Sequence, residues 1–503
     1  MKRIINYIGV LSLLFCLNTS CELVSEDYGQ INASIFPETE ADADAITTSA
    51  AYSPFKNHFY GGIFNIADGI LIVSDEASDY GMCNWGWDHI NYANWTTNDT
   101  WLTTRPYGYC SEISKMTLTI DRLNQIDMDD DLKQHYIAEL RLGRGWLAYL
   151  IYDFYGPFPI ADLETLKNPI EEKILPRLGE EEMKSYIETE LIEAAKVLPL
   201  NYKKGDKNYG RFTAGLARTV LLKFYMLTHQ WDKAESVGRE LLKSDYGYDL
   251  VSNYKDIFTL ANEKNVEIIW ACQCAKGYQE HKWQPHVLPN DYNFTPYLDK
   301  MTKWNGYKIS WSFMHTFDPD DKRLETIASE YTSKDGVVHN EENDSKNPSA
   351  QLYYGAVPLK YEFDPECTGE DSQVDWIIYR FADVLTLTAE AIVRNANTVT
   401  QEAVDLLNRV RTRSLPGKAY SLSDLNSTDK FLNAVLNERG WELYFEGHRR
   451  QDLIRHGKYI DAIKEKAKLM GKQTLVDENR YRLPIPQTVI DEGKGIIKQN
   501  PGY

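Results

Sequence analysis

The sequence predicts an all-α protein: a tetratricopeptide-like helix-pair scaffold with long irregular loops and a few short strands. Apolar residues recur at helical spacing in two regions, near 132–244 and 377–456, and breakers such as the Gly-Pro-Phe-Pro run at 156–159 separate the helices. The stretch 213–244 also has the length and spacing of a tetratricopeptide hairpin. The residues that carry this spacing are Leu221, Leu222, Tyr225 and Ala234. Each pair is expected to bury its apolar stripe against the next pair.

The beginning of the chain has the features of an export signal. Two basic residues follow the first methionine, and the apolar run 8–17 is too short to span a bilayer. Small and polar residues then lead to Cys21, in a loose match to the bacterial lipobox, in which the cysteine is acylated. We therefore expect a lipoprotein signal peptide over 1–20, a lipid on Cys21 and an N-terminal tether over 21–35. An ordinary secretory signal with an incidental cysteine is the alternative.

Two loop-rich insertions interrupt the helical pattern, near 75–110 and 275–376. The second follows a short strand-like run at 266–270 and is rich in Asn, Pro, Gly, Tyr and Trp. Long irregular connections inside a compact domain often carry function. We expect one domain over 36–503, with its ligand-binding residues in these two insertions.

The composition limits the classes of protein to consider. With 43% hydrophobic and 26% charged residues, the 503-residue chain is not a polytopic membrane protein. It has 55 Lys and Arg against 74 Asp and Glu, a formal net charge of −19, and no long basic run. A nucleic-acid partner is therefore not expected. The same charge disfavours anionic ligands, although a local basic patch could override it.

The cysteines give little support for a disulfide framework or a metal site. Without Cys16 of the signal and the acylated cysteine, an odd number of five remains, so at least one has no partner within the chain. The export signal leaves a Cys83–Cys110 disulfide open. Cys272 and Cys274, on an apolar strand-like run, are expected to be structural.

The tryptophans point to a carbohydrate ligand. Seven of the 12 fall in the two insertions, among Asn, Asp, Gly and Tyr rather than Leu or Val. A sugar offers a C–H face that stacks on an aromatic ring, and hydroxyls that need amide, carboxylate or guanidinium partners. The predicted ligand-binding residues are Trp85, Trp87, Asn94, Trp95 and Arg105 in the first insertion and Trp283, Tyr292, Trp304 and Trp311 in the second. The alternative is that these rings only anchor the loops to the scaffold.

Charged motifs elsewhere are expected to be structural. Near the C-terminus, opposite charges fall three or four residues apart on predicted helices, a spacing at which they pair. These residues are Arg439, Glu442, Glu446, Arg449, Asp452 and Arg455. An arginine beside each carboxylate lowers the carboxylate's pKa, which argues against acid/base catalysis. The carboxylates Asp318, Asp320 and Asp321 could hold a structural calcium ion, but their spacing is not that of an EF-hand loop, so a capped turn is favoured. No other cofactor is expected.

Short motifs in a shared order resemble those of the SusD/RagB family of Bacteroidetes outer-membrane lipoproteins. They extend over nearly the whole of the exported chain, and the C-terminal ones are the most diagnostic. They include FPETEAD at 36–42, YDFYG at 152–156, GRFT at 210–213, DPDDKR at 318–323, YRFADVL at 379–385, NER at 437–439, FEGHR at 445–449, PIP at 484–486 and QNPGY at 499–503.

This resemblance implies a function as well as a fold. It implies a non-enzymatic, lipid-anchored protein on the extracellular face of the outer membrane, which binds a glycan and delivers it to a SusC-like TonB-dependent transporter. RagB-type members bind peptides, so a peptide-binding import module is the alternative. An all-α glycosidase is a further alternative, which would need two carboxylates at a defined separation.

Overall fold

The structure is a computed structural model of the chain. It describes residues 37–58, 61–67, 69–99, 105–168, 173–293, 300–367 and 369–503. The expected signal peptide, the lipid on Cys21 and the tether over 21–35 lie outside the described residues.

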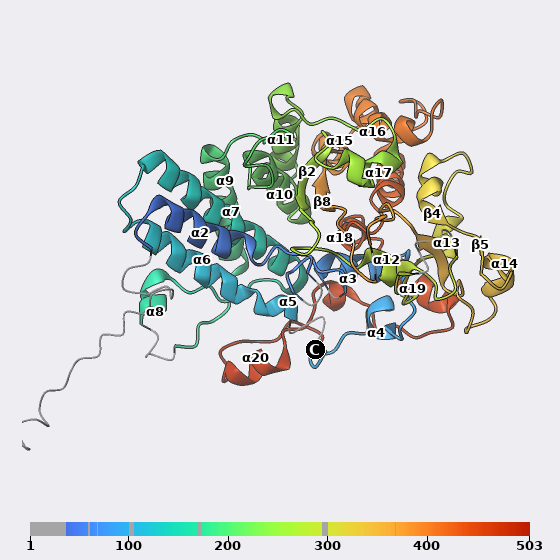
Figure 1. Cartoon of the computed structure of the whole chain (residues 1–503), viewed down its shortest axis with the longest axis horizontal. Coiled ribbons are helices and arrows are strands. Elements are labelled where there is room, and N and C mark those ends of the chain that lie inside the picture. Colours follow the sequence, from blue (N-terminus) through green and yellow to red (C-terminus); the bar gives the residue numbers. More distant parts are fainter. Residues whose placement is uncertain are drawn as a thin grey trace, which may run out of the picture.

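The first group of helices packs around the long helix α7 (Asp130–Tyr155), on the left in Figure 1. Asp129 caps its start by accepting a hydrogen bond from the Leu132 amide, and the helix ends at Gly156, whose φ is 74°. A left-handed φ of this kind favours glycine. Its packing partners are α2 (Glu40–Tyr52), α6 (Cys110–Leu123) and α9 (Glu180–Val197). The buried ring of Trp146 on α7 packs against Phe55, Trp270 and Tyr379 in the core beside this group.

The predicted hairpin at 213–244 is confirmed. Thr213 caps the start of α10 (Ala214–Leu227) through a hydrogen bond from the Leu216 amide, and α11 (Trp231–Leu241) packs back on it. Helix α11 also packs on α15 (Phe381–Ala396), where Gly238 lies against Thr388 so closely that a larger residue would collide. The second predicted helical region, near 377–456, contains α15, α16 (Gln401–Ser414) and α17 (Thr428–Glu442). The protein is therefore predominantly helical, as expected.

Shorter helices complete the described chain. They are α3 (Ile70–Glu76), α4 (Asp88–Asn91), α5 (Arg105–Gly108), α8 (Leu163–Lys167), α12 (Trp283–Val287), α13 (Trp311–Met314), α14 (Glu341–Asp344), α18 (Arg449–Arg455), α19 (Tyr459–Leu469) and α20 (Gln487–Glu492). Short 3₁₀ helices span 244–246, 254–258, 260–262, 322–326 and 478–481.

The two loop-rich insertions meet in a small antiparallel sheet. Its strand order is β1 (Gly81–Cys83), β3 (Tyr307–Ser310), β7 (Gly355–Pro358) and β4 (Ile327–Ala328). Two further pairs are β2 (Ile268–Cys272) with β8 (Trp376–Arg380), and β5 (Tyr331–Thr332) with β6 (Val338–His339). Strand β1 belongs to the first insertion and β3 to the second, so their pairing brings the two predicted ligand-binding regions together.

Buried ion pairs hold the C-terminal helices in place. The side chains of Arg323 and Arg380 have no solvent exposure, and Glu442 of α17 accepts hydrogen bonds from both. Their other carboxylate partners are Asp321, Glu267, Glu438 and Glu446. The expectation that the charged motifs form structural ion pairs is confirmed, but most of the partners are distant in sequence rather than three or four residues away.

Buried histidines make the stability depend on pH. Burial lowers the pKa of His281 to about 4 and that of His286 to about 3; burial and the neighbouring Lys223 lower that of His448 to about 3. Between about pH 6.5 and pH 4 these three histidines therefore bind more protons in the unfolded chain than in the folded one. Well below pH 6.5, each histidine should lower the free energy of unfolding by about 1.4 kcal/mol per pH unit as the pH falls.

Urea unfolding at pH 7.5, 6.5 and 5.5 tests this prediction. Burial raises the pKa of Asp75 and Glu263 to about 7, and these carboxyls act in the opposite direction, so the test compares the parent with a His286→Asn variant. Between pH 6.5 and pH 5.5 the free energy of unfolding of the parent should fall relative to that of the variant. An unchanged difference between the two proteins over this range would contradict the prediction.

All five described cysteines are unpaired thiols, including Cys83 and Cys110. The Cys83–Cys110 disulfide that the sequence left open is therefore not formed in this structure. The thiols of Cys272 and Cys274 contact the Phe55 carbonyl and the Asn57 side chain, respectively, as expected for structural residues.

Candidate functional site

A groove of about 270 Å³ lies where the first strand of the small sheet meets α13, α14 and the end of α19. Residues of both insertions and of the C-terminal region line it, so it forms only when the chain is folded. The lining residues are Met82, Ser310, Trp311, Ser312, His315, Glu341, Ser345, Tyr353, Tyr354, Lys466, Leu469 and Met470.

Three half-buried aromatic side chains give this groove its apolar surface. Trp311 is anchored at its edge, because its indole Nε1 donates a hydrogen bond of 3.0 Å to the Leu352 carbonyl. The rings of Tyr353 and Tyr354 lie 4.9 Å apart in an edge-to-face arrangement. Tyr354 also packs against the small buried cluster of Met82, Tyr92 and Ala467. Rings held in this way can stack on a ligand without losing much conformational freedom on binding.

Polar groups lie along the same groove. The hydroxyls of Ser310 and Ser312 are 3.2 Å apart, and each can act as donor or acceptor. His315 Nε2 lies 2.8 Å from a carboxylate oxygen of Glu341, and both side chains are exposed. Lys466 is buried at the groove and donates to the Glu76 and Gly81 carbonyls. The groove therefore combines aromatic faces with groups that can hydrogen-bond to hydroxyls.

A second cluster joins three of the predicted tryptophans. The indole Nε1 of Trp85 donates a hydrogen bond of 2.7 Å to the Trp304 carbonyl, and the Trp85 and Trp87 rings lie 5.7 Å apart. All three are half-buried. Gly306 permits this contact, because a Cβ there would lie 2.3 Å from the Trp85 ring. The first and second insertions thus meet through these side chains.

Other predicted residues are buried inside the protein. Trp95 and Trp283 are 1% exposed and Tyr292 is 2% exposed. The Trp283 ring packs against Trp376 at 5.6 Å, and that of Tyr292 against Tyr331 at 4.8 Å. None of the three offers a ring face to a ligand in this structure. The alternative, that such rings anchor loops, describes them better.

The side chain of Asn94 makes two hydrogen bonds within the protein, here called the Asn94 clamp, and is not open to a ligand. Its side-chain amide donates to the Gln473 carbonyl at 2.9 Å, and its oxygen accepts from the Leu475 amide at 2.7 Å. An ion pair of 2.7 Å between Asp88 and Lys472 lies on the same connection. These bonds fix the segment that follows Leu469 and Met470 of the groove wall. The remaining predicted residue, Arg105, begins α5, is half-buried and does not line the groove.

Removal of the Asn94 clamp should make the groove wall more flexible without changing any residue that lines the groove. In an Asn94→Ala variant the segment 471–475 loses two hydrogen bonds, and we expect ligand affinity to fall by about three- to tenfold, because an ordered wall then costs conformational entropy on binding. Calorimetric titration measures the affinity. Asn290→Ala, on an exposed part of the second insertion, is the control. Unchanged affinity in Asn94→Ala would show that the wall does not depend on this clamp.

Sequence reasoning missed Tyr353 and Tyr354. They end a polar stretch and are not part of a recurring apolar pattern. Two adjacent tyrosines beside many polar residues indicate a ligand-binding loop in the same way as the loop tryptophans do. Their position beside Trp311, however, depends on the sheet and could not be seen in the sequence.

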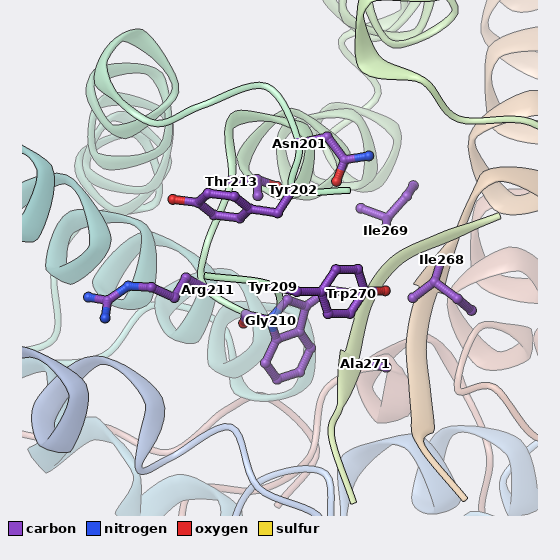
Figure 2. Close-up of a pocket in the computed structure, with 10 residues that line it drawn as sticks. All are labelled: Asn201, Tyr202, Tyr209, Gly210, Arg211, Thr213, Ile268, Ile269, Trp270 and Ala271. Carbon is purple, nitrogen blue, oxygen red and sulfur yellow. Dashed lines mark hydrogen bonds between the residues drawn. The ribbon is translucent and has the colours of Figure 1, made fainter. Parts of the chain in front are cut away.

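Figure 2 shows a much smaller cavity, of about 20 Å³, beside strand β2. Trp270 donates an indole hydrogen bond of 3.1 Å to the Gly210 carbonyl, and Arg211 is paired with Glu139 and Asp44. The space suffices for about one water molecule. We interpret it as a packing feature at the start of the helical hairpin.

The three aspartates considered for calcium have protein cations as partners. Asp318 and Asp320 bind Lys418 at 2.6 and 2.9 Å, and Asp321 binds Arg323 and caps the 3₁₀ helix that follows. The capped turn favoured by the sequence is thus observed. Over the described ranges, no group of three or more His, Cys, Asp or Glu side chains is arranged to hold a metal ion. In the same part of the chain, no helix has both the length and the hydrophobicity needed to cross a membrane.

Comparison with known proteins agrees with the fold. The model of the SusD family matches residues 266–503. SusD-like protein P25 of Formosa agariphila is 24% identical, over the full length of both chains. Starch-binding protein SusD of Bacteroides thetaiotaomicron is 22% identical, over 89% of this chain and 86% of the relative. Surface glycan-binding protein A of Bacteroides thetaiotaomicron, solved with laminarihexaose, superposes with a TM-score of 0.71 at 20% identity, over 92% of this chain and 99% of that structure.

The helical hairpins with an inserted sheet define a protein of the tetratricopeptide type, in which loops between the helices line the candidate groove. The match of the SusD family model to residues 266–503 and the full-length relative support a SusD/RagB-family protein, as the motifs indicated.

Proposed function

We propose that this protein is a cell-surface glycan-binding protein whose binding site is the groove lined by Trp311, Tyr353 and Tyr354. The observation that carries the proposal is the combination of these rings with the serine hydroxyls and the His315–Glu341 pair. Sugar C–H faces stack on the rings, while hydroxyls at the sugar edges exchange hydrogen bonds with the polar groups. Two similar proteins support the same ligand class: the starch-binding protein SusD and the surface glycan-binding protein solved with laminarihexaose.

Binding rather than hydrolysis fits the groove chemistry. Glycoside hydrolysis generally requires two carboxylates, about 5 to 9.5 Å apart, around the scissile bond. Among the residues that line the groove, Glu341 is the one carboxylate, and it is paired with His315. We therefore propose a protein without catalytic activity.

A ligand screen tests this function against its alternatives. Calorimetry of the mature protein with neutral oligosaccharides, and separately with peptide digests, should give heat of binding for at least one glycan and none for the peptides. Peptide binding without glycan binding would favour a RagB-like import module. The release of new reducing ends during incubation would favour a glycosidase.

We further propose that the protein delivers its glycan to a SusC-like TonB-dependent transporter on the extracellular face of the outer membrane. The likeness to the SusD/RagB family supports this role. Affinity purification from native membranes should recover such a transporter together with this chain, and a preparation that contains none would count against the partnership.

Lipid anchoring should depend on Cys21. A Cys21→Ala variant is expected to move from the membrane pellet to the soluble fraction, because a protein without the acyl chains has no stable anchor. Its glycan affinity should stay unchanged. Fractionation in a strain without the transporter separates the two modes of attachment: a variant that still pellets there is not held by a lipid on this cysteine.

A further inference from the structure

A second and larger cavity, of about 350 Å³, lies in the helical part of the molecule. It is formed by the last turns of α7 and α10, the first turns of α9, helix α18 and the segment 481–482, and it shares no lining residue with the groove. Its lining residues are Tyr152, Asp153, Glu180, Lys184, Leu227, Thr228, His229, Arg450, Ile454, Tyr481 and Arg482. Its volume is in the range of cavities that bind small molecules.

The charge of this lining is opposite to that of the chain. The protein carries a formal net charge of −19, whereas the cavity is lined by three cationic side chains and two carboxylates. Burial and the nearby Arg394 lower the pKa of His229, so this histidine adds no positive charge at neutral pH. The cavity is thus a local basic site of the kind that can override the overall acidity.

The two carboxylates already have partners inside the cavity. Glu180 accepts hydrogen bonds from Arg482, at 2.5 and 3.2 Å, and from the Tyr152 hydroxyl at 2.8 Å. Asp153 accepts from Arg450 and from Gln451, each at 3.3 Å. Neither carboxylate therefore needs a cationic ligand to compensate its charge.

One of the cations, Lys184, can contact a ligand directly. Arg450 is only 1% exposed, so its charge acts on the cavity from within the wall rather than by contact. Lys184 pairs with Glu181 at 2.8 Å, but the Glu181 side chain is 87% exposed. Ion pairs of this exposed kind are weak and exchange readily.

We propose that this cavity binds a small molecule that carries a carboxylate. Lys184 contacts the carboxylate, and the buried charge of Arg450 attracts it. The side chains of Tyr152, Leu227 and Ile454 contact the carbon skeleton. A carboxylate of this size comes from two sources, the uronic acid residue of a glycan or the C-terminus of a short peptide. The site is separate from the groove and does not depend on what the groove binds.

Calorimetry with matched probes tests the proposal and identifies the source. Galacturonate is compared with galactose, and glycylglycine with glycylglycinamide, so that each pair differs in the carboxylate. At least one carboxylate probe should bind about tenfold or more tighter than its neutral counterpart, and its affinity should fall with added salt. Binding of galacturonate alone indicates a sugar acid, and binding of glycylglycine alone indicates a peptide.

Two lysines of helix α9 supply the variant and its control. Lys184→Glu should weaken the binding of the carboxylate probe by about tenfold or more, because it replaces attraction by repulsion. Lys196 makes the same type of i,i+3 pair, with Glu193, at the other end of this helix, so Lys196→Glu should leave the affinity within about twofold. Trp311→Ala should also leave it unchanged, which separates this site from the groove.

Three results would overturn the proposal. They are the absence of binding for both carboxylate probes, equal binding of each probe and its neutral counterpart, and equal losses in Lys184→Glu and Lys196→Glu. Circular dichroism of both lysine variants confirms that they are folded; an unfolded Lys184→Glu protein is replaced by Lys184→Gln, which should weaken binding by about threefold or more.

Discussion

Replacing Trp311 by alanine is expected to reduce glycan affinity by about 5- to 150-fold. A ring that stacks on a ligand contributes about 1–3 kcal/mol, by analogy with bases stacked on aromatic side chains, and each 1.4 kcal/mol is a factor of ten in the dissociation constant. The indole of Trp311 is held by its hydrogen bond to the Leu352 carbonyl and lines the groove. Calorimetric titration with the best glycan of the screen measures the loss, and Tyr353→Ala should show a loss of the same order.

The control separates binding from folding. Trp231 is also half-buried, but it lies on α11 and stacks on His229 at 4.8 Å, away from the groove. Trp231→Ala should lower the melting temperature at least as much as Trp311→Ala while keeping full glycan affinity. If both variants lose affinity in proportion to their loss of stability, the groove does not bind the glycan.

The helical scaffold could be predicted because its signals are local. The apolar spacing of α10, the cap at Thr213 and the break before Trp231 lie within one short stretch of sequence. The small sheet could not be predicted in the same way. Strand β1 pairs with β3, which lies more than 200 residues later, and β3 pairs with β7, so no local pattern indicates the partners.

The binding residues were predicted less well, for a related reason. The polar neighbours of a tryptophan show that it lies in a loop, but not whether its ring points inward. Trp283 and Trp95 have such neighbours and are buried, whereas Trp311 has them and lines the groove. Tyr354 joins the groove through its packing on the cluster of Met82, Tyr92 and Ala467, which are distant in sequence and meet it only in the folded protein.

Charge spacing indicated ion pairs in the C-terminal helices but not their partners. Asp452 and Arg455 do pair at i,i+3, as expected. Arg439 instead binds Asp383 of α15, and Arg380 reaches across from β8 to Glu442. Because these partners come from separate elements, the charges fix how the elements pack on one another. The consequence for stability can be measured.

Replacing Glu442 by glutamine is expected to destabilise the protein by about 3–5 kcal/mol, the usual cost of removing one partner from a buried ion pair. Its carboxylate accepts hydrogen bonds from Arg323, Arg380 and Arg413, and its side chain has no solvent exposure. Although burial raises its pKa, Arg413, Arg380 and Arg323 together hold the pKa of Glu442 well below its ordinary value. Glutamine has nearly the same shape but no charge, so the three buried guanidinium groups lose one of their carboxylate partners.

Urea unfolding at pH 7 measures this loss, and an exposed pair gives the control. Glu402 is 47% exposed and binds Arg239, itself 43% exposed, so Glu402→Gln removes a carboxylate–arginine pair that is not buried and should change the stability little.

The destabilisation by Glu442→Gln should also depend on pH. A carboxylate with a lowered pKa stabilises the fold above its unfolded pKa of about 4.3, and this contribution is lost as the pH falls. The difference in the free energy of unfolding between the parent and Glu442→Gln should therefore become smaller below that pH. An equal loss of stability in both glutamine variants at pH 7 would show that the buried network does not hold these helices together.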